Sequence, residues 1–520
     1  MRIKLLPSIA SLLLVSAFTT SCLDNDQNVE YSKDATIRAF AIDTVGYGVT
    51  YKFTINQLGD PALIFNADSL PVGADTIIDR ILVTTFTSAS GIVTMKTKDG
   101  INDSLISFAD SMDLRKPLTV TVWSTEAYAG ISTIKKEYRI EVRVHKHDPD
   151  SLRWQKQDTG IDNGIDGPLR SIVYKGNNIL TYAMVGGNLK LYTSSIDAPN
   201  AWTGEGQVTA GGNAVTTRVS SIVAYKDVLY ATFEGNNQGY TSIDGLTWIP
   251  SALQNAVLFL APIQEKATDG TMTDTRLSYL KQKDANTYLF ATSADGTSEE
   301  YPDAKKESID EWTFKTFPHA ITSYTNFKRP NGTQGTILIG EAEISTTIND
   351  TNGDPVSIAL PWAYSQETDP QGVVTSQWVP LQAGSTLSYC PELKNPTIIY
   401  YNEKFYLFGS GFQAAYTSQS GRDWKLDKKF GFPRHAWSGS LTEHDVVEFR
   451  GRQHFSVVEN PDTRYLIFMF GKEHVSFVET LPDAPSTRLS LTHNYDHESE
   501  VWLTRLNQLW FDLANGVANN

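Results

Sequence analysis

The chain has 520 residues, of which 40% are hydrophobic, 11% aromatic and 20% charged, and its formal net charge is −15. This length exceeds what one hydrophobic core usually holds, so we expect at least two domains. The negative charge argues against non-specific binding to nucleic acid or anionic lipid, and we predict no nucleic-acid partner. The aromatic content is typical of β-sheets rather than helical bundles.

The first residues have the composition of an export signal. Arg2 and Lys4 precede an apolar run over residues 5–18, which is too short for a membrane span of about 20 residues. The run ends in Thr19-Thr20-Ser21-Cys22. This motif resembles a lipoprotein signal-peptidase site, with Thr19 where such sites usually carry Leu. The resemblance implies a signal peptide over residues 1–21 and a lipid anchor on Cys22; the alternative is an ordinary secretory signal with a chance cysteine.

The residues after Cys22 bear on the destination of the protein. Leu23-Asp24-Asn25-Asp26-Gln27 is acidic and polar, and it resembles the surface-export signal of Bacteroidota lipoproteins. We therefore predict a lipid-anchored outer-membrane protein that faces the cell exterior, with residues 22–33 as a tether. With Cys22 lipidated, Cys390 is the remaining cysteine. We expect it to be a small buried apolar residue.

Residues 34–147 alternate between apolar and polar side chains, as β-strands do. In the segment 36–42 we expect Ile37 and Ala39 on one face and Phe40 on the other. Further strands are predicted over residues 49–55, 80–87, 118–123 and 136–144. Six or seven strands without a helical period predict a β-sandwich. The pattern resembles the cadherin-like or immunoglobulin-like modules that begin many Bacteroidota lipoproteins.

A polar segment, 145–150, marks the boundary of this first domain. It contains His145 and His147, which indicate a solvated linker more than a metal site because no third ligand accompanies them.

Residues 151–520 contain a repeated pattern that predicts a β-propeller. An aromatic residue followed within two positions by a small polar one recurs at Tyr192, Tyr240, Phe290, Tyr364 and Tyr416, spaced by 48, 50, 74 and 52 residues. A period near 50 residues is that of a four-stranded propeller blade. One repeat shows its strands directly, over residues 219–225, 228–233, 239–242 and 247–250. The 74-residue interval indicates an insertion around residues 326–354 or a long loop after 369–372.

The ends of this region supply a further blade. Strands are predicted over residues 464–471 and 500–506, and the strand 151–156 could complete the last blade and close the ring. We therefore favour six blades, with seven as the alternative.

Within the repeats, residues 242–248 (Ser-Ile-Asp-Gly-Leu-Thr-Trp) resemble the Asp-box of sialidase-type propellers. Residues 418–424 keep the Ser, Gly and Trp but have Ser420 in place of the Asp, and Trp312 follows the related segment 290–296. Asp and Gly are suited to a tight turn, and we expect the Trp to pack between blades. The motif implies a structural role on the outer hairpin. The whole layout resembles a family of Bacteroidota surface lipoproteins with a cadherin-like first domain and a propeller-like second half, and implies no particular activity.

Known catalytic and metal-binding patterns are not found in the sequence. Arg329-Pro330 and Pro433-Arg434 do not match the arginine element of sialidases, and no hydrolase triad order, zinc-protease motif or phosphate loop occurs. Residues 350–355 are similar to a calcium loop, but Gly353 stands in the wrong place, so we predict a hairpin turn. We assign no catalytic residue, metal or cofactor.

The segment 433–445 is dense in side chains that suit ligand binding. We predict that four of its residues line the mouth of a pocket: Arg434, His435, Trp437 and His444. Trp437 would offer a flat face to a sugar ring. The alternative is an inter-blade loop with ordinary aromatic packing, and the same two interpretations apply to His493 and His497.

Two functions remain open. The first is a monomeric surface protein for binding or scaffolding, an accessory in the capture of a glycan or protein ligand. The second is a glycoside hydrolase or lyase with a divergent propeller site. Carboxylates clustered in the central funnel would favour the enzyme, and an aromatic funnel poor in carboxylates would favour binding.

Overall fold

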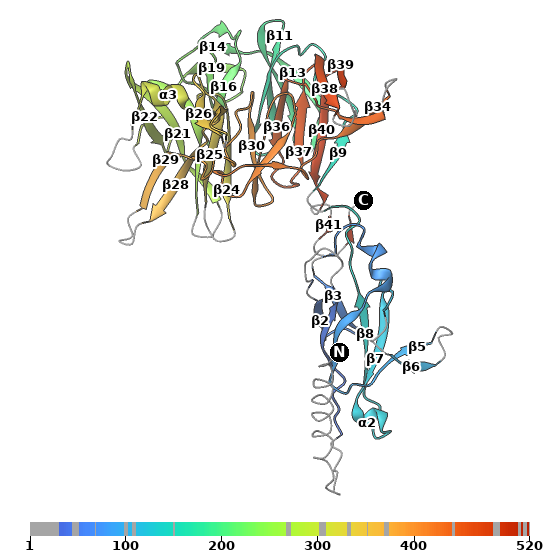
Figure 1. Cartoon of the computed structure of the whole chain (residues 1–520). Helices are drawn as coiled ribbons and strands as arrows, with labels where there is room; N and C mark the ends of the chain where they lie inside the picture. Colours follow the sequence, from blue (N-terminus) through green and yellow to red (C-terminus); the bar gives the residue numbers. More distant parts are fainter. Residues whose placement is uncertain are drawn as a thin grey trace, which may run out of the picture. The chain divides into compact units, whose positions relative to one another are not determined.

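The computed structural model describes residues 31–518, apart from 44–50, 52, 68, 98–101, 107–110, 149–150, 267–271, 301–307, 330–333, 351, 369–373, 439–442, 482–488, 508–510 and 513–516. The chain divides into two compact units, Met1–Asp148 and Pro149–Asn520, and both are built almost entirely of strands (Figure 1). In the described part, no helix is long and apolar enough to cross a membrane. Cys22 and the predicted export signal lie outside the described residues.

The first unit is a sandwich of two sheets around one core. One sheet pairs β1 (Ile37–Ile42) with β4 (Val83–Ser88). The other has the order β2 (Phe53–Asn56), β3 (Ala62–Asn66), β8 (Lys135–Glu141), β7 (Leu118–Trp123), β5 (Val93–Lys96) and β6 (Asp103–Leu105). Short helical turns lie at η1 (Ala74–Thr76), η2 (Ile78–Arg80) and α2 (Thr125–Tyr128). Ile64, Val120 and Tyr138 are fully buried in the shared core.

Strand β1 departs from the predicted alternation. Ile37 and Phe40 are both buried, at 1% and 6% exposure. In a regular strand, residues three positions apart point to opposite faces, so both would not be buried in the same core. The register against β4 shifts between Ile37 and Ala39. Such a bulge turns the following side chains over, so the expectation that Phe40 lies opposite Ile37 is wrong.

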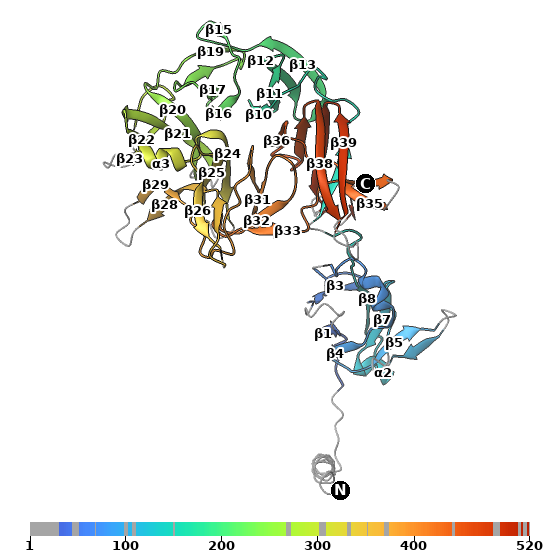
Figure 2. The same cartoon turned by 45° about the horizontal axis from the view of Figure 1, so that its top comes forward.

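The second unit is a six-bladed β-propeller, which confirms the favoured count among the described residues (Figure 2). Blade 1 consists of β10 (Leu169–Tyr174), β11 (Asn178–Val185), β12 (Asn188–Ser195) and β13 (Ala198–Gln207). Blade 2 consists of β16 (Val219–Tyr225), β17 (Val228–Phe233), β18 (Tyr240–Ser242) and β19 (Thr247–Pro250), extended by β14 (Thr209–Ala210) and β15 (Asn213–Ala214). Blade 3 consists of β20 (Ala256–Lys266), β21 (Met272–Asp284), β22 (Thr287–Ser293) and β23 (Ser308–Asp310).

The other three blades have the same antiparallel order. Blade 4 consists of β24 (Ala320–Lys328), β25 (Gln334–Glu341), β28 (Trp362–Thr368) and β29 (Val374–Pro380). Blade 5 consists of β30 (Thr397–Tyr401), β31 (Lys404–Phe408), β32 (Ala415–Ser418) and β33 (Lys425–Asp427). Blade 6 consists of β36 (Phe455–Glu459), β37 (Leu466–Phe470), β40 (Glu500–Leu506) and β9 (Leu152–Lys156).

Strand β9 closes the ring as the sequence predicts. It pairs with β40 from Lys156 opposite Trp502 to Leu152 opposite Leu506, so the first strand of the unit completes the last blade. The Trp154 ring packs against Phe468 and Phe449, at centroid distances of 4.9 and 5.2 Å. This pairing joins the start of the propeller to its last blade and so closes the ring through backbone hydrogen bonds.

The five repeated aromatic residues confirm the predicted period. Each lies in the third strand of its blade: Tyr192 in β12, Tyr240 in β18, Phe290 in β22, Tyr364 in β28 and Tyr416 in β32. The long interval contains helix α3 (Glu311–Thr316) and the hairpin of β26 (Thr346–Asn349) and β27 (Pro355–Ile358). This hairpin turns at Asp350, which confirms a hairpin turn there.

Between the third and fourth strands, the repeats form a self-contained turn, here named the Ser–Asp–Gly turn (residues 242–248 and 293–298). Asp244 Oδ1 accepts hydrogen bonds from the backbone N–H groups of Leu246 and Thr247, at 2.8 and 2.9 Å. Asp295 Oδ1 does the same for residues 297 and 298, both at 2.7 Å. In the third copy, residues 418–424, Ser420 Oγ takes this role at 3.1 and 3.3 Å.

The tryptophan of the turn packs between blades, as predicted. Trp248 is fully buried and donates its Nε1–H to the Gly245 carbonyl at 3.0 Å. It lies in a core cluster shared with blade 1, next to Tyr182. Trp312 differs, because it lies in α3 with 64% of its surface exposed. It is therefore not the turn tryptophan of its repeat.

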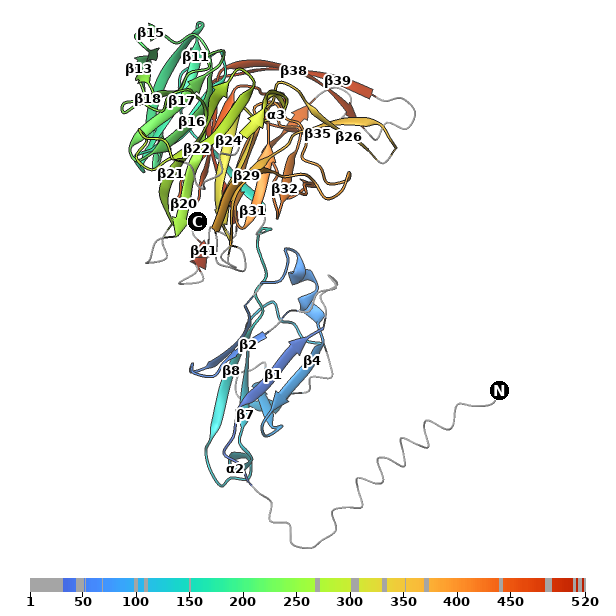
Figure 3. The same cartoon turned by 90° about the vertical axis from the view of Figure 1, so that its left-hand side faces the viewer.

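The propeller has two faces, which differ in the strand ends, turns and hairpins that they carry. The first strand of every blade begins at one face, here named the cavity face, and the Ser–Asp–Gly turns lie at the opposite face, here named the turn face. The hairpins β26–β27 and β38 (Glu473–Leu481)–β39 (Leu489–His497) join the second and third strands of blades 4 and 6, so both rise from the cavity face (Figure 3). The hairpin β34 (Arg434–Ser438)–β35 (Glu443–Val447) precedes β36 at the same face, and β41 (Phe511–Asp512) and β42 (Val517–Ala518) pair near the C-terminus.

Candidate functional site

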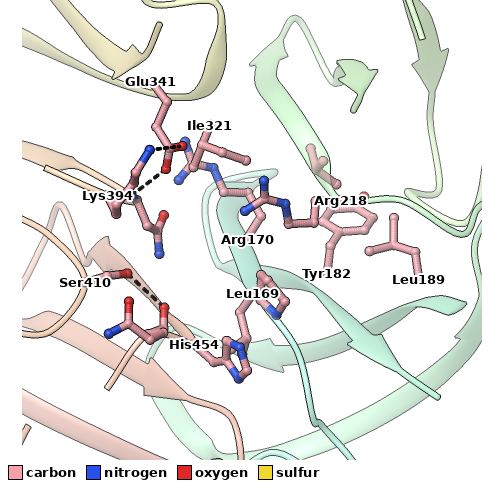
Figure 4. Close-up of a pocket in the computed structure, with 14 residues that line it drawn as sticks. Leu169, Arg170, Tyr182, Leu189, Arg218, Ile321, Glu341, Lys394, Ser410 and His454 are labelled. Atoms are coloured by element: carbon pink, nitrogen blue, oxygen red, sulfur yellow. Dashed lines mark hydrogen bonds and ion pairs between the residues drawn. The ribbon is translucent and has the colours of Figure 1, made fainter. Parts of the chain in front are cut away.

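A cavity of about 320 Å³ opens where the inner strands begin, and it is named the axial cavity here. Residues from blades 1, 2, 4, 5 and 6 line it: Pro168, Leu169, Arg170, Tyr182, Leu189, Arg218, Val219, Ile321, Glu341, Lys394, Asn395, Ser410, Gln453 and His454 (Figure 4). This size is at the lower end of ligand pockets. The cavity suits one small ligand or one end of a longer one.

Most polar side chains of the axial cavity are held by a neighbour. Arg218 donates to both oxygens of Glu234, at 2.8 and 2.6 Å. Glu341 accepts from the Asn395 backbone N–H at 2.8 Å and lies 3.5 Å from the Lys394 ammonium group. Asn395, Ser410 and Gln453 each donate to a backbone carbonyl. These contacts give the wall a fixed arrangement.

Two polar side chains of the cavity differ from the rest. Within the described part of the chain, Arg170 makes no hydrogen bond or ion pair, and the buried Nδ1 of His454 has no partner. Figure 4 shows Arg170 and Arg218 directed into the same space. Burial lowers the pKa of Arg170 to about 10; Glu341 opposes this effect and Arg218 adds to it. Arg170 therefore keeps its charge at neutral pH.

A second cavity, of about 680 Å³, lies along the inner strands and is named the distal cavity. Arg170 lines both cavities, so it stands where the two meet. In the distal cavity, burial raises the pKa of Glu459 to about 7 although Arg464 lies 3.0 Å away and acts in the opposite direction. Hydroxyl groups of the inner strands join adjacent blades here, as Ser323 accepts from the Ile398 N–H and Ser456 from the Ser171 N–H.

The predicted segment 433–445 forms the β34–β35 hairpin beside blade 6. Arg434 is exposed on β34, and neither Arg434 nor His435 lines the axial cavity. His435 Nδ1 lies 2.5 Å from Glu448 Oε2, and its ring meets Tyr495 edge-on at 5.5 Å. The structure thus brings His435 next to the second predicted segment, with His493 and His497. The backbones of Trp437 and His444 pair across the hairpin, but their side chains lie outside the described part.

Three potential metal ligands meet beside this hairpin. The ligand atoms of Glu448, His497 and Glu500 lie within 4.8 Å of one another. Glu500 already accepts from Lys156 at 2.8 Å and from Arg452, which is fully buried, at 3.0 Å. A metal ion would have to displace or approach these two cations, so the charges of the site disfavour it. Burial and then Arg452 lower the pKa of His497, which keeps the imidazole neutral.

Sequence reasoning did not find the axial cavity residues. Arg170 and Arg218 each stand at the start of the first strand of a blade, in successive repeats. The two positions are not equivalent, because Ser171 corresponds to Ser221: each hydroxyl bonds a threonine of the second strand. Arg170 therefore corresponds to Ser220, and no repeated basic residue marked the cavity. Lys394 and His454 follow no repeat pattern either, because they lie in loops of different length.

The fold and the cavity together define a class: a two-domain all-β protein with a small polar cavity on the axis of a six-bladed propeller. A family model described as the DUF6242 beta propeller domain matches residues 148–514, and one described as the DUF6242 N-terminal domain matches residues 22–142. The chain belongs to the DUF6242 family.

Curated proteins give no match to this chain. Solved structures similar to it include a putative oxidoreductase (glucose dehydrogenase) from Thermus thermophilus, with 12% identity over 68% of this chain and 100% of that one and a TM-score of 0.29. The WD40 domain of Toxoplasma gondii coronin has 11% identity over 69% and 88%, with a TM-score of 0.28. The GH43 endo-arabinanase of Bacillus licheniformis has 12% identity over 65% and 96%, with a TM-score of 0.24. Such TM-scores say nothing about activity.

Proposed function

We propose that this chain is a lipid-anchored outer-membrane protein, exposed at the cell surface, that captures glycans as a monomeric binding or scaffold protein. The sequence around Cys22 supports the anchor and the acidic residues 23–27 support the surface location. The propeller supplies a rigid body for a binding site. Because one fold can carry many functions, the function has to be argued from the site.

The observation that carries the proposal is the axial cavity. It combines fixed polar groups with two unpartnered ones, Arg170 and His454, at the centre of the ring. Among the described residues, the Arg170 side chain lines the cavity without a hydrogen-bond partner, so it favours a ligand that supplies an acceptor. Sugars offer many hydroxyl groups as donors and acceptors.

The alternative is a glycoside hydrolase or lyase, and the carboxylates bear on it. A glycosidase of the common type uses two carboxyl groups roughly 5–10 Å apart. The described lining of the axial cavity contains one carboxylate, Glu341, which Lys394 and Asn395 already engage. In the distal cavity the described lining contains Glu459 alone. A funnel with so few carboxylates favours binding over hydrolysis.

We include the four residues predicted from sequence in the proposal, as ligand contacts outside the axial cavity. The β34–β35 hairpin belongs to the cavity face, so Arg434, His435, Trp437 and His444 would contact the distal part of a long glycan. We expect Trp437→Ala to weaken glycan binding with little change in Tm. A large fall in Tm would instead assign Trp437 to packing between blades.

A glycan array tests the proposal. The full chain with Cys22→Ala, recovered from the soluble fraction, would be applied to neutral and acidic oligosaccharides. Wild-type protein in the membrane fraction is the control for the effect of the lipid anchor. We expect selective binding and release of the variant from the membrane. Binding to no glycan would contradict the capture function, cleavage of a bound glycan would favour the alternative, and a folded variant that stays in the membrane would contradict the anchor.

A further inference from the structure

The charges around the axial cavity are not balanced. Three cations line it, Arg170, Arg218 and Lys394, against one carboxylate, Glu341. Glu234 lies behind Arg218 and neutralises it through two hydrogen bonds. Lys394 and Glu341 form the second pair, at 3.5 Å. The positive charge of Arg170 therefore has no counter-charge of its own among the described residues, in a chain whose net charge is −15.

The position of Arg170 makes this excess costly without a ligand. Its guanidinium group is surrounded by the walls of the cavity, although the residue stays partly exposed there, and this loss of hydration lowers its pKa to about 10. A buried charge usually has an ion pair or hydrogen bonds that offset the loss of hydration. Among the described residues, Glu341 is near enough to act on Arg170 through space but does not bond to it.

We propose that the axial cavity binds the carboxylate group of an acidic saccharide, with Arg170 as the residue that holds it. This inference rests on the proposed glycan-binding function and names the class of glycan. The five fixed donors of a guanidinium group match the two oxygens of a carboxylate. One free positive charge matches one negative charge, whereas a doubly charged phosphate would meet Glu341 as well.

The remaining lining fits a sugar ring that carries this carboxylate. The hydroxyl of Ser410, which donates to the Gln453 carbonyl, can still accept a hydrogen bond from a sugar hydroxyl group. Leu169, Leu189 and Ile321 supply apolar surface for the C–H face of the ring. The cavity of about 320 Å³ suits the terminal residue of a chain, while the rest of the glycan extends over the cavity face.

Titration calorimetry with three trisaccharide probes tests the inference on the full chain with Cys22→Ala. The probes are trigalacturonate, its neutral galactose counterpart and a sulfated galactose trisaccharide. We expect trigalacturonate to bind at least tenfold more tightly than the neutral probe, with an advantage that shrinks as salt is added, because the contact is ionic. Arg170→Gln should weaken trigalacturonate binding by about 30-fold or more and leave the neutral probe nearly unaffected.

Two further variants keep the test independent of folding. Arg170→Lys retains the charge but not the planar fork, so it should recover part of the preference for the acidic probe. Lys425→Gln removes one exposed positive charge from β33, away from the cavity, and should change nothing. Melting curves of all variants would accompany the titrations.

The outcomes separate the two levels of the proposal. Equal affinity for acidic and neutral probes would overturn the carboxylate inference and leave glycan capture intact. An acidic preference unchanged in folded Arg170→Gln and Arg170→Lys would remove Arg170 from the site. Binding of the sulfated probe alone would overturn the choice of carboxylate, and binding of none would overturn glycan capture itself.

Discussion

The two faces of the propeller are built in different ways. On the turn face, each Ser–Asp–Gly turn is complete within seven residues, as when Ser242, Asp244, Gly245 and Trp248 bond to one another or to the backbone between them. On the cavity face, the lining comes from five blades, and among the described residues the Arg170 guanidinium group and the Nδ1 atom of His454 have no hydrogen-bond partner. The turn face makes its hydrogen bonds between neighbours in the sequence, whereas the cavity face contains polar side-chain atoms without a hydrogen-bond partner in the described part of the chain.

This difference indicates where stability and function reside. The turns recur in several blades, so the loss of one leaves the others intact. The axial cavity exists once and depends on closure of the entire ring. We therefore expect changes at the turn face to alter stability by amounts set by local contacts, and changes that open the ring to remove the cavity.

Removal of the closing strand is the strongest way to break this comparison. A chain that begins at residue 165 lacks β9, and with it the pairing to β40 and the hydrogen bond from Trp154 Nε1 to the Gly431 carbonyl at 2.7 Å. We expect this chain to show no cooperative unfolding by circular dichroism or calorimetry, whereas a chain that begins at residue 151 unfolds in one transition. Identical melting of the two chains would show that β9 does not close the ring.

The next largest effect concerns the turn tryptophan. Trp248 is fully buried between blades 1 and 2, so we expect Trp248→Ala to lower the free energy of unfolding by about 3–5 kcal/mol. Trp312, which is 64% exposed, is the matched control, and Trp312→Ala should change that energy by less than about 0.5 kcal/mol. Denaturant titration measures both. Similar losses in the two variants would mean that α3 packs more closely than its exposure indicates.

Much of the fold could be predicted because its signals are local. The strands 219–225, 228–233 and 247–250 appear with the predicted bounds as β16, β17 and β19. The alternation of side chains and the turn residues between strands fix such elements without any distant contact. The bulge in β1 could not be predicted, because its register shift depends on the pairing with β4.

The axial cavity could not be predicted for a related reason. Arg170 and His454 are far apart in the sequence, and only the ring brings them to one cavity. Conversely, the dense segment 433–445 drew attention because its residues are neighbours in the chain. The structure pairs His435 with Glu448 at the edge of blade 6, and the link between that hairpin and a ligand remains a prediction.

The pH dependence of stability offers a third test, at the distal cavity. Burial raises the pKa of Glu459 to about 7, from an ordinary value of 4.5. The folded state therefore binds a proton more tightly than the unfolded state, so this group stabilises the fold below pH 4.5 and loses that contribution as the pH rises through 7. Compared with wild type, Glu459→Gln should gain on the order of 2 kcal/mol between pH 5 and pH 8. Parallel Tm curves for the two proteins would show that Glu459 has an ordinary pKa.

A smaller effect is expected when one turn loses its acceptor. In Asp244→Ala the backbone N–H groups of residues 246 and 247 lose the carboxylate that accepts from them. We expect a loss of about 1–2 kcal/mol in the free energy of unfolding, as for a helix that loses its capping residue. Asp244→Asn keeps an acceptor oxygen at this position and should lose less than half of that amount. Equal losses would indicate that the charge matters and the acceptor does not.

The smallest effect should be a gain, and it tests whether the three turns are equivalent. Ser420 accepts from the N–H groups of Arg422 and Asp423 at 3.1 and 3.3 Å, which is longer than the 2.7–2.9 Å found with Asp244 and Asp295. A carboxylate reaches further and accepts more strongly, so Ser420→Asp should raise the free energy of unfolding by about 0.5 kcal/mol. The gain stays small because Asp423 places a second negative charge next to the new one, although Ser388 and Gly384 already donate to Asp423. Denaturant titration with Ser420→Asn, which adds the acceptor without the charge, separates reach from repulsion. If both variants lose stability, the backbone of the third turn differs from the other two, and the turn face is less uniform than its hydrogen bonds indicate.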